Sequence, residues 1–341
     1  MRVGIDCRKI DDFGIGTYIR GLLNAMTGVD YVAFGPRGIE LPAGVEHAVV
    51  DAPKYSIREL FTIGRGANID LFHAPHYVVP FVDVPFVVTI HDLIHLRHRN
   101  PLARIYARRM IGRAIRKSRR VITVSETVRR EIETEFGHAE KIALTPNGVD
   151  HVILSRADGE GSPRERSFAS LRMTDRPYFL FVGNDKPHKN VDRLVEASSH
   201  VQGAQLILVG GVFERFRDRA FVTGFVSREE LASLYRGAIA LVQPSLDEGF
   251  GLPALEAMAC GTAVITSNAP ALIEITGDAA LHVDAQSIDA IANAMSRVMH
   301  DASLRTSMIA RGIDRAKKFT WGRCADLTRE IYAVSLDNAF H

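Results

Sequence analysis

Hydrophobic and polar positions along the chain form a series of short apolar runs separated by longer amphipathic segments. In the first half the runs cover residues 2–6, 31–35, 70–75, 86–92 and 121–125. They end in polar residues, as parallel strands buried on both faces do at their carboxyl ends. Helices are expected at 16–26, at 101–120 after the N-cap residue Asn100, and at 126–136 after the N-cap residue Ser125.

The alternation ends with residues 142–150 and starts again later in the chain. Residues 154–176 are polar and rich in Ser, Gly and Arg, which indicates a linker. Strands are then expected at 178–183, 205–211, 220–225, 238–244 and 263–267, and helices at 190–200, 227–236, 253–260 and 287–300. Two such series predict an α/β protein with two doubly wound, Rossmann-like domains. In these folds the ligand lies at the carboxyl ends of the strands, here in the cleft between the domains.

The composition is typical of a soluble globular protein. Hydrophobic residues make up 46% and charged residues 24% of the 341 positions. No apolar run approaches the roughly 20 residues that span a bilayer, and the first residues form a strand pattern without a signal region. Cys7, Cys260 and Cys324 are few and widely spaced, so a reducing cytoplasm is the expected location. The net charge of +2 gives no sign of a nucleic-acid partner.

The stretch DEGFGLPALEAMACG, residues 247–261, places two glutamates around glycines and a proline. Pro253 suits the first position of a helix and Gly261 suits the residue just past its end. Glu248 is therefore expected on the loop that follows a strand, and Glu256 about one turn into the helix.

These positions suit a phosphorylated, polyhydroxylated ligand. The N-terminus of a helix attracts phosphate, and Gly249 and Gly251 let the backbone approach a ligand closely. Glu256 could accept hydrogen bonds from both hydroxyls of a ribose, and Glu248 from a second sugar. The alternative is that Glu256 only complements the helix dipole and that Glu248 is a solvated loop acid.

Residues 248–267, EGFGLPALEAMACGTAVITS, resemble the E-x7-E signature of retaining glycosyltransferases of the large GT-B family 4. Other segments similar to that family occur in the right order: TVSETVRREI, TPNGVD, FVGNDKPHKN, LILVGG and VTGFVSREELASLYRGA. The likeness runs from Met1 to about Trp321. It implies two Rossmann-like domains facing each other across a cleft. Residues 1–165 would bind the acceptor, 166–320 would bind the nucleotide-sugar donor, and a C-terminal helix in 321–341 would pack back on the first domain.

The resemblance gives four residues a role. Glu248 would hold the donor sugar near its reacting centre, and His91, also near that sugar, would act with it in catalysis. Glu256 would bind the nucleotide ribose. Lys189 would neutralise the diphosphate as it departs, which the chemistry requires because negative charge develops there. The alternatives are a hydrogen-bonded structural histidine for His91 and a solvated lysine for Lys189.

Other donor contacts are implied with less support from the residues themselves. Asn184 stands near the place of an arginine usual in the family, so Lys186 or His188 would have to supply a second cation. Gly14 and Gly16 form only part of a dinucleotide fingerprint, and a plain tight turn is the alternative to a role beside the diphosphate and the acceptor. The remaining donor-binding residues expected are Gly224, Phe225, Gly249, Phe250, Gly251 and Leu252.

No metal and no cofactor besides the donor are expected. One alternative is a metal-dependent hydrolase built on histidines close in sequence, chiefly His73, His76 and His91, with His95, His98 and Asp92 nearby. Their spacing matches no zinc signature. A second alternative is a protein that binds a nucleotide sugar without turning it over.

Residues 97–120 carry basic side chains throughout and no acid. One face of the expected helix could hold most of the apolar side chains of Leu102, Ile105, Tyr106, Met110 and Ile115. A basic amphipathic helix suits an anionic membrane surface or a phosphate-bearing acceptor, with Arg108, Arg109, Arg113 and Arg116 as contacts. The alternative is a domain helix with an apolar core face and solvated arginines.

These observations together predict a retaining, metal-independent glycosyltransferase. It would move a sugar, with mannose as one candidate, from a nucleoside diphosphate to a hydroxyl of a glycan or lipid-linked acceptor. The expected setting is cell-surface polysaccharide or glycolipid synthesis, in the cytoplasm or peripherally on the inner face of the membrane.

Overall fold

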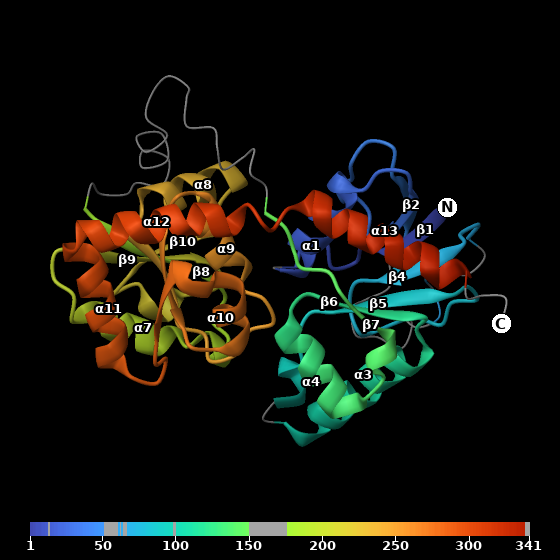
Figure 1. The fold of residues 1–341 in the computed structure, drawn as a ribbon, viewed down its shortest axis with the longest axis horizontal. Coiled ribbons are helices and arrows are strands. Elements are labelled where there is room, and N and C mark those ends of the chain that lie inside the picture. Colours follow the sequence, from blue (N-terminus) through green and yellow to red (C-terminus); the bar gives the residue numbers. More distant parts are fainter. Residues whose placement is uncertain are drawn as a thin grey trace. The chain divides into compact units, whose positions relative to one another are not determined.

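The computed structural model describes residues 1–12, 14–50, 61, 63, 67–97, 100–149 and 176–337. The chain divides into two units (Figure 1): unit 1 comprises Met1–Gly148 and Trp321–His341, and unit 2 comprises Val149–Thr320. Almost all of the expected linker, and the domain boundary placed at residue 165, lie outside the described residues. Each unit contains one parallel sheet with helices, so the α/β, Rossmann-like fold class is confirmed.

The sheet of unit 1 has seven parallel strands within the described residues, in the order β3-β2-β1-β4-β5-β6-β7. The strands are β1 (Arg2–Asp6), β2 (Asp30–Gly35), β3 (Glu46–Val49), β4 (Leu71–Ala74), β5 (Phe86–Ile90), β6 (Arg120–Thr123) and β7 (Ile142–Leu144). The helices are α1 (Ile15–Ala25), α3 (Pro101–Lys117), α4 (Glu126–Phe136) and α13 (Trp321–Asp337). Strand β3 was not expected, because it lies at the edge of the sheet and has no buried residue.

Helix α13, red in Figure 1, packs against α1 and contacts β5 and β6. A Cβ atom placed on Gly21 of α1 would lie only 2.2 Å from the ring of Trp321, so the helix pair requires glycine there. Tyr332 is fully buried, and its hydroxyl lies 2.6 Å from His73 Nδ1. The last helix of the chain therefore belongs to the core of the first unit.

The sheet of unit 2 has six parallel strands within the described residues, in the order β10-β9-β8-β11-β12-β13. The strands are β8 (Tyr178–Gly183), β9 (Gln205–Gly210), β10 (Phe221–Gly224), β11 (Ala240–Gln243), β12 (Ala263–Ser267) and β13 (Ala280–Val283). The helices are α7 (Val191–Ser199), α8 (Arg228–Gly237), α9 (Leu252–Ala259), α10 (Pro270–Thr276), α11 (Ile288–His300) and α12 (Ala302–Ala316). The strand order reverses between β8 and β11. Rossmann-like domains bind ligands at such a point, outside the carboxyl ends of the strands.

Local capping signals set the helix ends as the sequence predicted. The Asn100 side chain accepts a hydrogen bond from the backbone N–H of Leu102, and Ser125 accepts one from Val128. Ser227 and Glu230 form a reciprocal capping box at the start of α8. Among the described helices, none has both the length and the apolar character needed to cross a bilayer.

Candidate active site

The loops that follow β8 and β11 are tied together at the point where the strand order reverses. Asn190 has left-handed backbone geometry (φ 59°), and its buried amide donates to the carbonyls of Pro244 (3.1 Å) and Ala285 (2.7 Å). The backbone N–H of Leu246 donates to the carbonyl of His188 at 2.7 Å. The lysine of the first loop and the glutamate of the second are thereby brought together.

Lys189 and Glu248 form a nearly buried ion pair. Lys189 Nζ lies 2.6 Å from Glu248 Oε1, and the two side chains are 16% and 10% exposed. Gln243 Nε2 donates to the same oxygen at 2.7 Å, and Ser245 Oγ donates to it at 2.8 Å. Burial alone would raise the pKa of the Glu248 carboxyl, but the Lys189 charge and these hydrogen bonds outweigh burial and hold the pKa below its usual value. Glu248 is therefore an ionised acceptor.

Glu256 lies one turn into α9, as expected. The helix starts at Leu252 after Gly251, whose φ of 99° is left-handed and whose Cβ, if present, would lie 2.5 Å from Leu272 Cδ2. Tyr235 Oη of α8 donates a hydrogen bond to Glu256 Oε2 at 2.9 Å. Burial and the Glu256 charge raise the pKa of the Tyr235 hydroxyl, so it stays a donor. No role was assigned to Tyr235 from the sequence, where its one signal was its place on the buried face of a short helix.

The other residues expected at the donor site differ in how exposed they are. Phe225 lies just beyond β10 with its side chain 75% exposed, next to Gly224 (φ 73°). The ring of Phe250, by contrast, is buried edge-on against Phe319, with 5.9 Å between ring centroids. Asn184 Oδ1 accepts from the backbone N–H of Lys186 at 3.3 Å and closes the turn after β8.

In unit 1, His91 follows β5 at the carboxyl edge of the sheet. Its Nε2 donates to the carbonyl of Pro75 at 3.2 Å, and the edge of the Tyr18 ring packs on it with 4.9 Å between centroids. Burial lowers the pKa of His91 to about 4, so the ring is neutral at physiological pH, and a proton on Nε2 leaves Nδ1 as an acceptor. A Cβ on Gly16 would lie 2.1 Å from the carbonyl oxygen of Ile10, whereas Gly14 faces open space.

His73 and His76 are engaged in bonds that fix the fold of unit 1. His73 Nε2 lies 2.8 Å from Thr89 Oγ1, and its Nδ1 meets the Tyr332 hydroxyl. His76 Nδ1 accepts from the backbone N–H of Val78, and its Nε2 lies 3.1 Å from Lys9 Nζ. Within the described ranges, no group of three His, Cys, Asp or Glu side chains could hold a metal ion, and His98 lies outside them. These bonds give no support to the hydrolase alternative.

Two family profiles match the chain one after the other. Residues 18–152 match the profile described as Glycosyltransferase Family 4, and residues 163–315 match the one described as Glycosyl transferases group 1. Together they cover all the described strands except β1, and they include His91, Lys189, Glu248 and Glu256. The chain belongs to the family 4 glycosyltransferases, which have the GT-B fold.

Named relatives of this glycosyltransferase include two bacterial mannosyltransferases. The O-antigen chain mannosyltransferase B of Escherichia coli is 29% identical over 285 residues, which cover 77% of this chain and 74% of the relative. The O-antigen chain mannosyltransferase RfbU of Salmonella typhimurium is 29% identical over 244 residues, covering 67% of this chain and 64% of the relative.

Solved structures agree on the fold. A sucrose-phosphate synthase from Thermosynechococcus elongatus superposes with a TM-score of 0.83 over 99% of this chain and 100% of its own, at 21% identity. HepE of Anabaena, in complex with UDP and glucose, superposes with a TM-score of 0.78 over 98% of this chain and 100% of its own, at 16% identity.

Helix α3 of this glycosyltransferase corrects the face expected from the sequence. Ile115 is buried, but Leu102 is 76% exposed, and Ile105 and Tyr106 are also exposed. At 100° per residue Leu102 and Tyr106 lie about 140° and about 180° around the helix from Ile115, so the five apolar residues do not share a face. The outward face instead carries apolar side chains in its first two turns, followed by Arg109 and Arg116.

The four arginines named from the sequence have different surroundings. Arg108 pairs with Glu135 of α4 at 2.7 Å. Arg113 donates to the carbonyl of Val79 at 2.7 Å and stacks over the ring of Phe81, 4.2 Å from its centroid. Arg109 and Arg116 are exposed and have no ion-pair partner in the part of the chain that the structure describes. The charge that is free to meet a ligand is therefore smaller than the sequence suggests.

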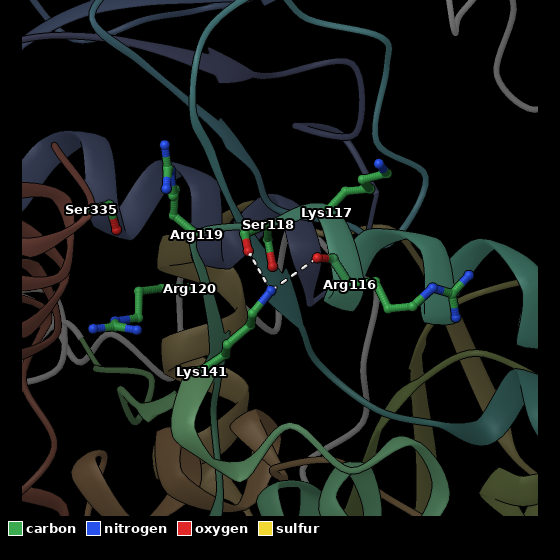
Figure 2. Close-up of a pocket in the computed structure, with 7 residues that line it drawn as sticks. All are labelled: Arg116, Lys117, Ser118, Arg119, Arg120, Lys141 and Ser335. Carbon is green, nitrogen blue, oxygen red and sulfur yellow. Dashed lines mark hydrogen bonds between the residues drawn. The ribbon is translucent and has the colours of Figure 1, made fainter. Parts of the chain in front are cut away.

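A cavity of about 340 Å³ lies beyond the end of α3 (Figure 2). It is lined by Arg116, Lys117, Ser118, Arg119, Arg120, Lys141 and Ser335. Lys141 Nζ donates to the carbonyls of Arg116 (2.9 Å) and Ser118 (3.1 Å), and the head groups of Arg116 and Lys117 extend away from it. The Lys141 charge thus serves the C-terminal carbonyls of α3, as cations at helix ends do.

Proposed function

We propose that this glycosyltransferase moves a hexose from a nucleoside diphosphate to an acceptor hydroxyl, with retention of configuration at the anomeric carbon. The observation that carries the proposal is the ion pair of Lys189 and Glu248 beyond β11, with Glu256 one turn into the helix that follows the Glu248 loop. Mannose is the first candidate for the sugar, because both bacterial relatives are mannosyltransferases of O-antigen chains.

Each of the three side chains suits one part of such a donor. Glu256, held by Tyr235, accepts hydrogen bonds from the ribose hydroxyls. Lys189 and the N-terminus of α9 face the diphosphate and offset its charge without a metal ion. Glu248 accepts from hydroxyls of the sugar. Phe225, exposed beside Gly224, is positioned to contact the base.

Retention is proposed to proceed by departure and attack on the same face of the sugar. The bond between the anomeric carbon and the phosphate oxygen breaks, and the diphosphate leaves with the electron pair. The acceptor oxygen then bonds to the anomeric carbon, and its proton passes to the departing phosphate oxygen. Lys189 stabilises the charge that develops on the leaving group, and neutral His91 binds a sugar or acceptor hydroxyl.

The acceptor is proposed to be a glycan or a lipid-linked glycan, handled at the inner face of the membrane in cell-surface polysaccharide or glycolipid synthesis. The exposed Leu102, Ile105 and Tyr106 of α3, followed by Arg109 and Arg116, favour an anionic lipid surface. Apolar side chains can enter the headgroup region while the arginines meet lipid phosphates. Nucleic acid is not a partner in this proposal.

A donor panel tests the function. GDP-, UDP- and ADP-hexoses are compared for the rise they cause in the melting temperature, because a ligand of the folded state stabilises by mass action. The preferred donor is then assayed for transfer to glycan acceptors, with and without EDTA. Transfer that is insensitive to EDTA and is lost in Glu248→Ala supports the proposal. Stabilisation without transfer to any acceptor would instead indicate a nucleotide-sugar binding protein.

A further inference from the structure

Glu248 presents its two carboxylate oxygens to different surroundings. Oε1 receives three donors: Lys189 Nζ, Gln243 Nε2 and Ser245 Oγ. Oε2 has no hydrogen-bond partner within the part of the chain that the structure describes. Since the lone pairs of Oε1 are occupied, a further donor has to bind Oε2.

The two uncharged donors are themselves fixed by the sheet. Gln243 is the last residue of β11 and is buried, with Thr266 of β12 as its cross-strand neighbour. Ser245 is fully buried, and its carbonyl accepts a hydrogen bond from Ser267 Oγ at 2.5 Å. Strands β11 and β12 therefore determine where both donors point.

Gln243 also carries an unfavourable feature. Its carbonyl oxygen is buried and has no hydrogen-bond partner within the described ranges. A buried amide that uses only its N–H₂ group destabilises the fold relative to an apolar residue of the same shape. The hydrogen bond from Gln243 to Glu248 offers a functional reason for a glutamine at this buried position.

We propose that Gln243 and Ser245 are positioning residues that hold Glu248 through Oε1 and reserve Oε2 for a hydroxyl of the donor sugar. This inference rests on the proposed function and deepens it. Lys189 is shared between Glu248 and the diphosphate, so its hold on Oε1 weakens when the donor binds. Gln243 and Ser245 keep the carboxylate in place at that moment. The sugar, not the nucleotide, is the part of the donor that depends on them.

The test compares the affinity for the nucleoside diphosphate with that for the full nucleotide sugar. Gln243→Met keeps the side-chain volume and removes the donor, and Ser245→Ala removes the hydroxyl. Each variant is expected to bind the diphosphate as wild type does and to lose about tenfold in affinity for the nucleotide sugar, the scale of one hydrogen bond to a charged group. Thr266→Val is the matched control, since it removes a neighbouring buried hydroxyl that does not touch Glu248.

Gln243→Glu distinguishes a positioning role from a structural one through the pH dependence of nucleotide-sugar affinity. Two adjacent carboxyl groups share one proton with a raised pKa, so lowering the pH restores a donor to Oε1. Sugar affinity of this variant should rise as the pH falls below neutrality, and that of wild type should not. Parallel losses for diphosphate and nucleotide sugar, or wild-type sugar affinity in both neutral variants, would overturn the inference. A wild-type protein that binds neither ligand would overturn the proposed function instead.

Discussion

Tyr235 of α8 and Glu256 of α9 are joined by a hydrogen bond of 2.9 Å between the tyrosine hydroxyl and carboxylate Oε2. The two residues are 21 positions apart, and their helices pack against each other. Because the tyrosine is buried, its hydroxyl has a fixed direction and orients the carboxylate before any ligand arrives. A pre-oriented acceptor loses less entropy on binding a ribose.

Glu256→Ala should therefore weaken binding of the nucleoside diphosphate by about 1.5–3 kcal/mol, the range for hydrogen bonds to a charged acceptor. Tyr235→Phe should cause a smaller loss of the same kind, because the carboxylate remains but is less well placed. Isothermal calorimetry with the diphosphate alone measures both. Tyr178→Phe is the control, since its buried hydroxyl donates to the carbonyl of Leu234 in the same helix. Unchanged affinity in Glu256→Ala would remove the ribose assignment.

Lys189→Met should reduce affinity for the diphosphate more than affinity for the free nucleoside, because only the diphosphate offers an anion to this side chain. Lys186→Met removes an exposed lysine of the same loop and should have the smaller effect. Equal losses for nucleoside and diphosphate in Lys189→Met would show that the lysine does not contact phosphate.

The same variant should invert the pH dependence of stability in unit 2. In wild type the pKa of Glu248 is held below its unfolded value, so its contribution is present above the unfolded pKa and is lost as the pH falls through the folded one. Without Lys189, burial dominates and the folded pKa lies above the unfolded one. Acidification toward pH 5 should then stabilise Lys189→Met relative to wild type. Melting temperatures measured across that range decide the matter.

The local parts of this structure were predictable from the sequence. Buried parallel strands are continuous apolar runs, and the caps at Asn100, Ser125 and Ser227 act within three residues of themselves. The position of Glu256 one turn into its helix followed from Pro253 and Gly261 in the same way.

What the sequence missed depends on how side chains are directed once the elements have packed. Tyr235 meets Glu256 only after α8 and α9 have packed, and Gln243 read simply as the polar end of a strand. Leu102 was grouped with Ile115 on one apolar face, because a helix with apolar residues at both ends leaves open which of them the sheet covers.

His73 should make unit 1 lose stability in mild acid. Burial, with a smaller effect from His91, lowers its folded pKa to about 3, whereas an unfolded histidine has a pKa of about 6.5. The unfolded chain takes up the proton first, so the contribution is complete above about pH 6.5 and falls by roughly 1.4 kcal/mol per pH unit below it. Urea unfolding followed by the fluorescence of Trp321, the only tryptophan, reports on this unit. The slope should be shallower in His73→Gln; an equal slope would contradict the prediction.

Gly21→Ala should destabilise unit 1, although alanine in an exposed helix position stabilises by about 1 kcal/mol relative to glycine. The added Cβ would lie 2.2 Å from the Trp321 ring, which has to shift and loosen α13. Gly112→Ala in α3 is the matched control, since its Cβ would approach only the mobile end of Arg116 (3.0 Å) and Phe136. Thermal unfolding followed by Trp321 fluorescence should show a lower midpoint for Gly21→Ala alone.

The outward face of α3 should bind vesicles that contain anionic lipid. Arg109→Gln with Arg116→Gln removes two exposed charges of this face that lack an ion-pair partner among the described residues. Each arginine near such a surface contributes about 1 kcal/mol, so the double variant should bind roughly 30-fold more weakly. Leu102→Ser with Ile105→Ser should weaken binding as well, by removing apolar area from the headgroup region. Co-sedimentation with phosphatidylglycerol-containing and pure phosphatidylcholine vesicles measures both effects.

The control variant loses the same net charge, but from arginines that do not belong to the outward face of α3. Arg97 and Arg108 are occupied by Glu131 and Glu135 of α4, so Arg97→Gln with Arg108→Gln also removes two positive charges. That variant should bind anionic vesicles nearly as wild type does. Salt dependence adds a second criterion. The Debye length is about 10 Å at 0.1 M and shortens as the salt concentration rises. Rising salt should therefore weaken the contribution of the arginines to vesicle binding before that of the apolar side chains. Equal losses in both arginine pairs would indicate attraction by net charge alone, and binding indifferent to lipid charge would remove the membrane role. The assignment of Lys189, Glu248 and Glu256 to the donor would stand in either case, since all three belong to unit 2.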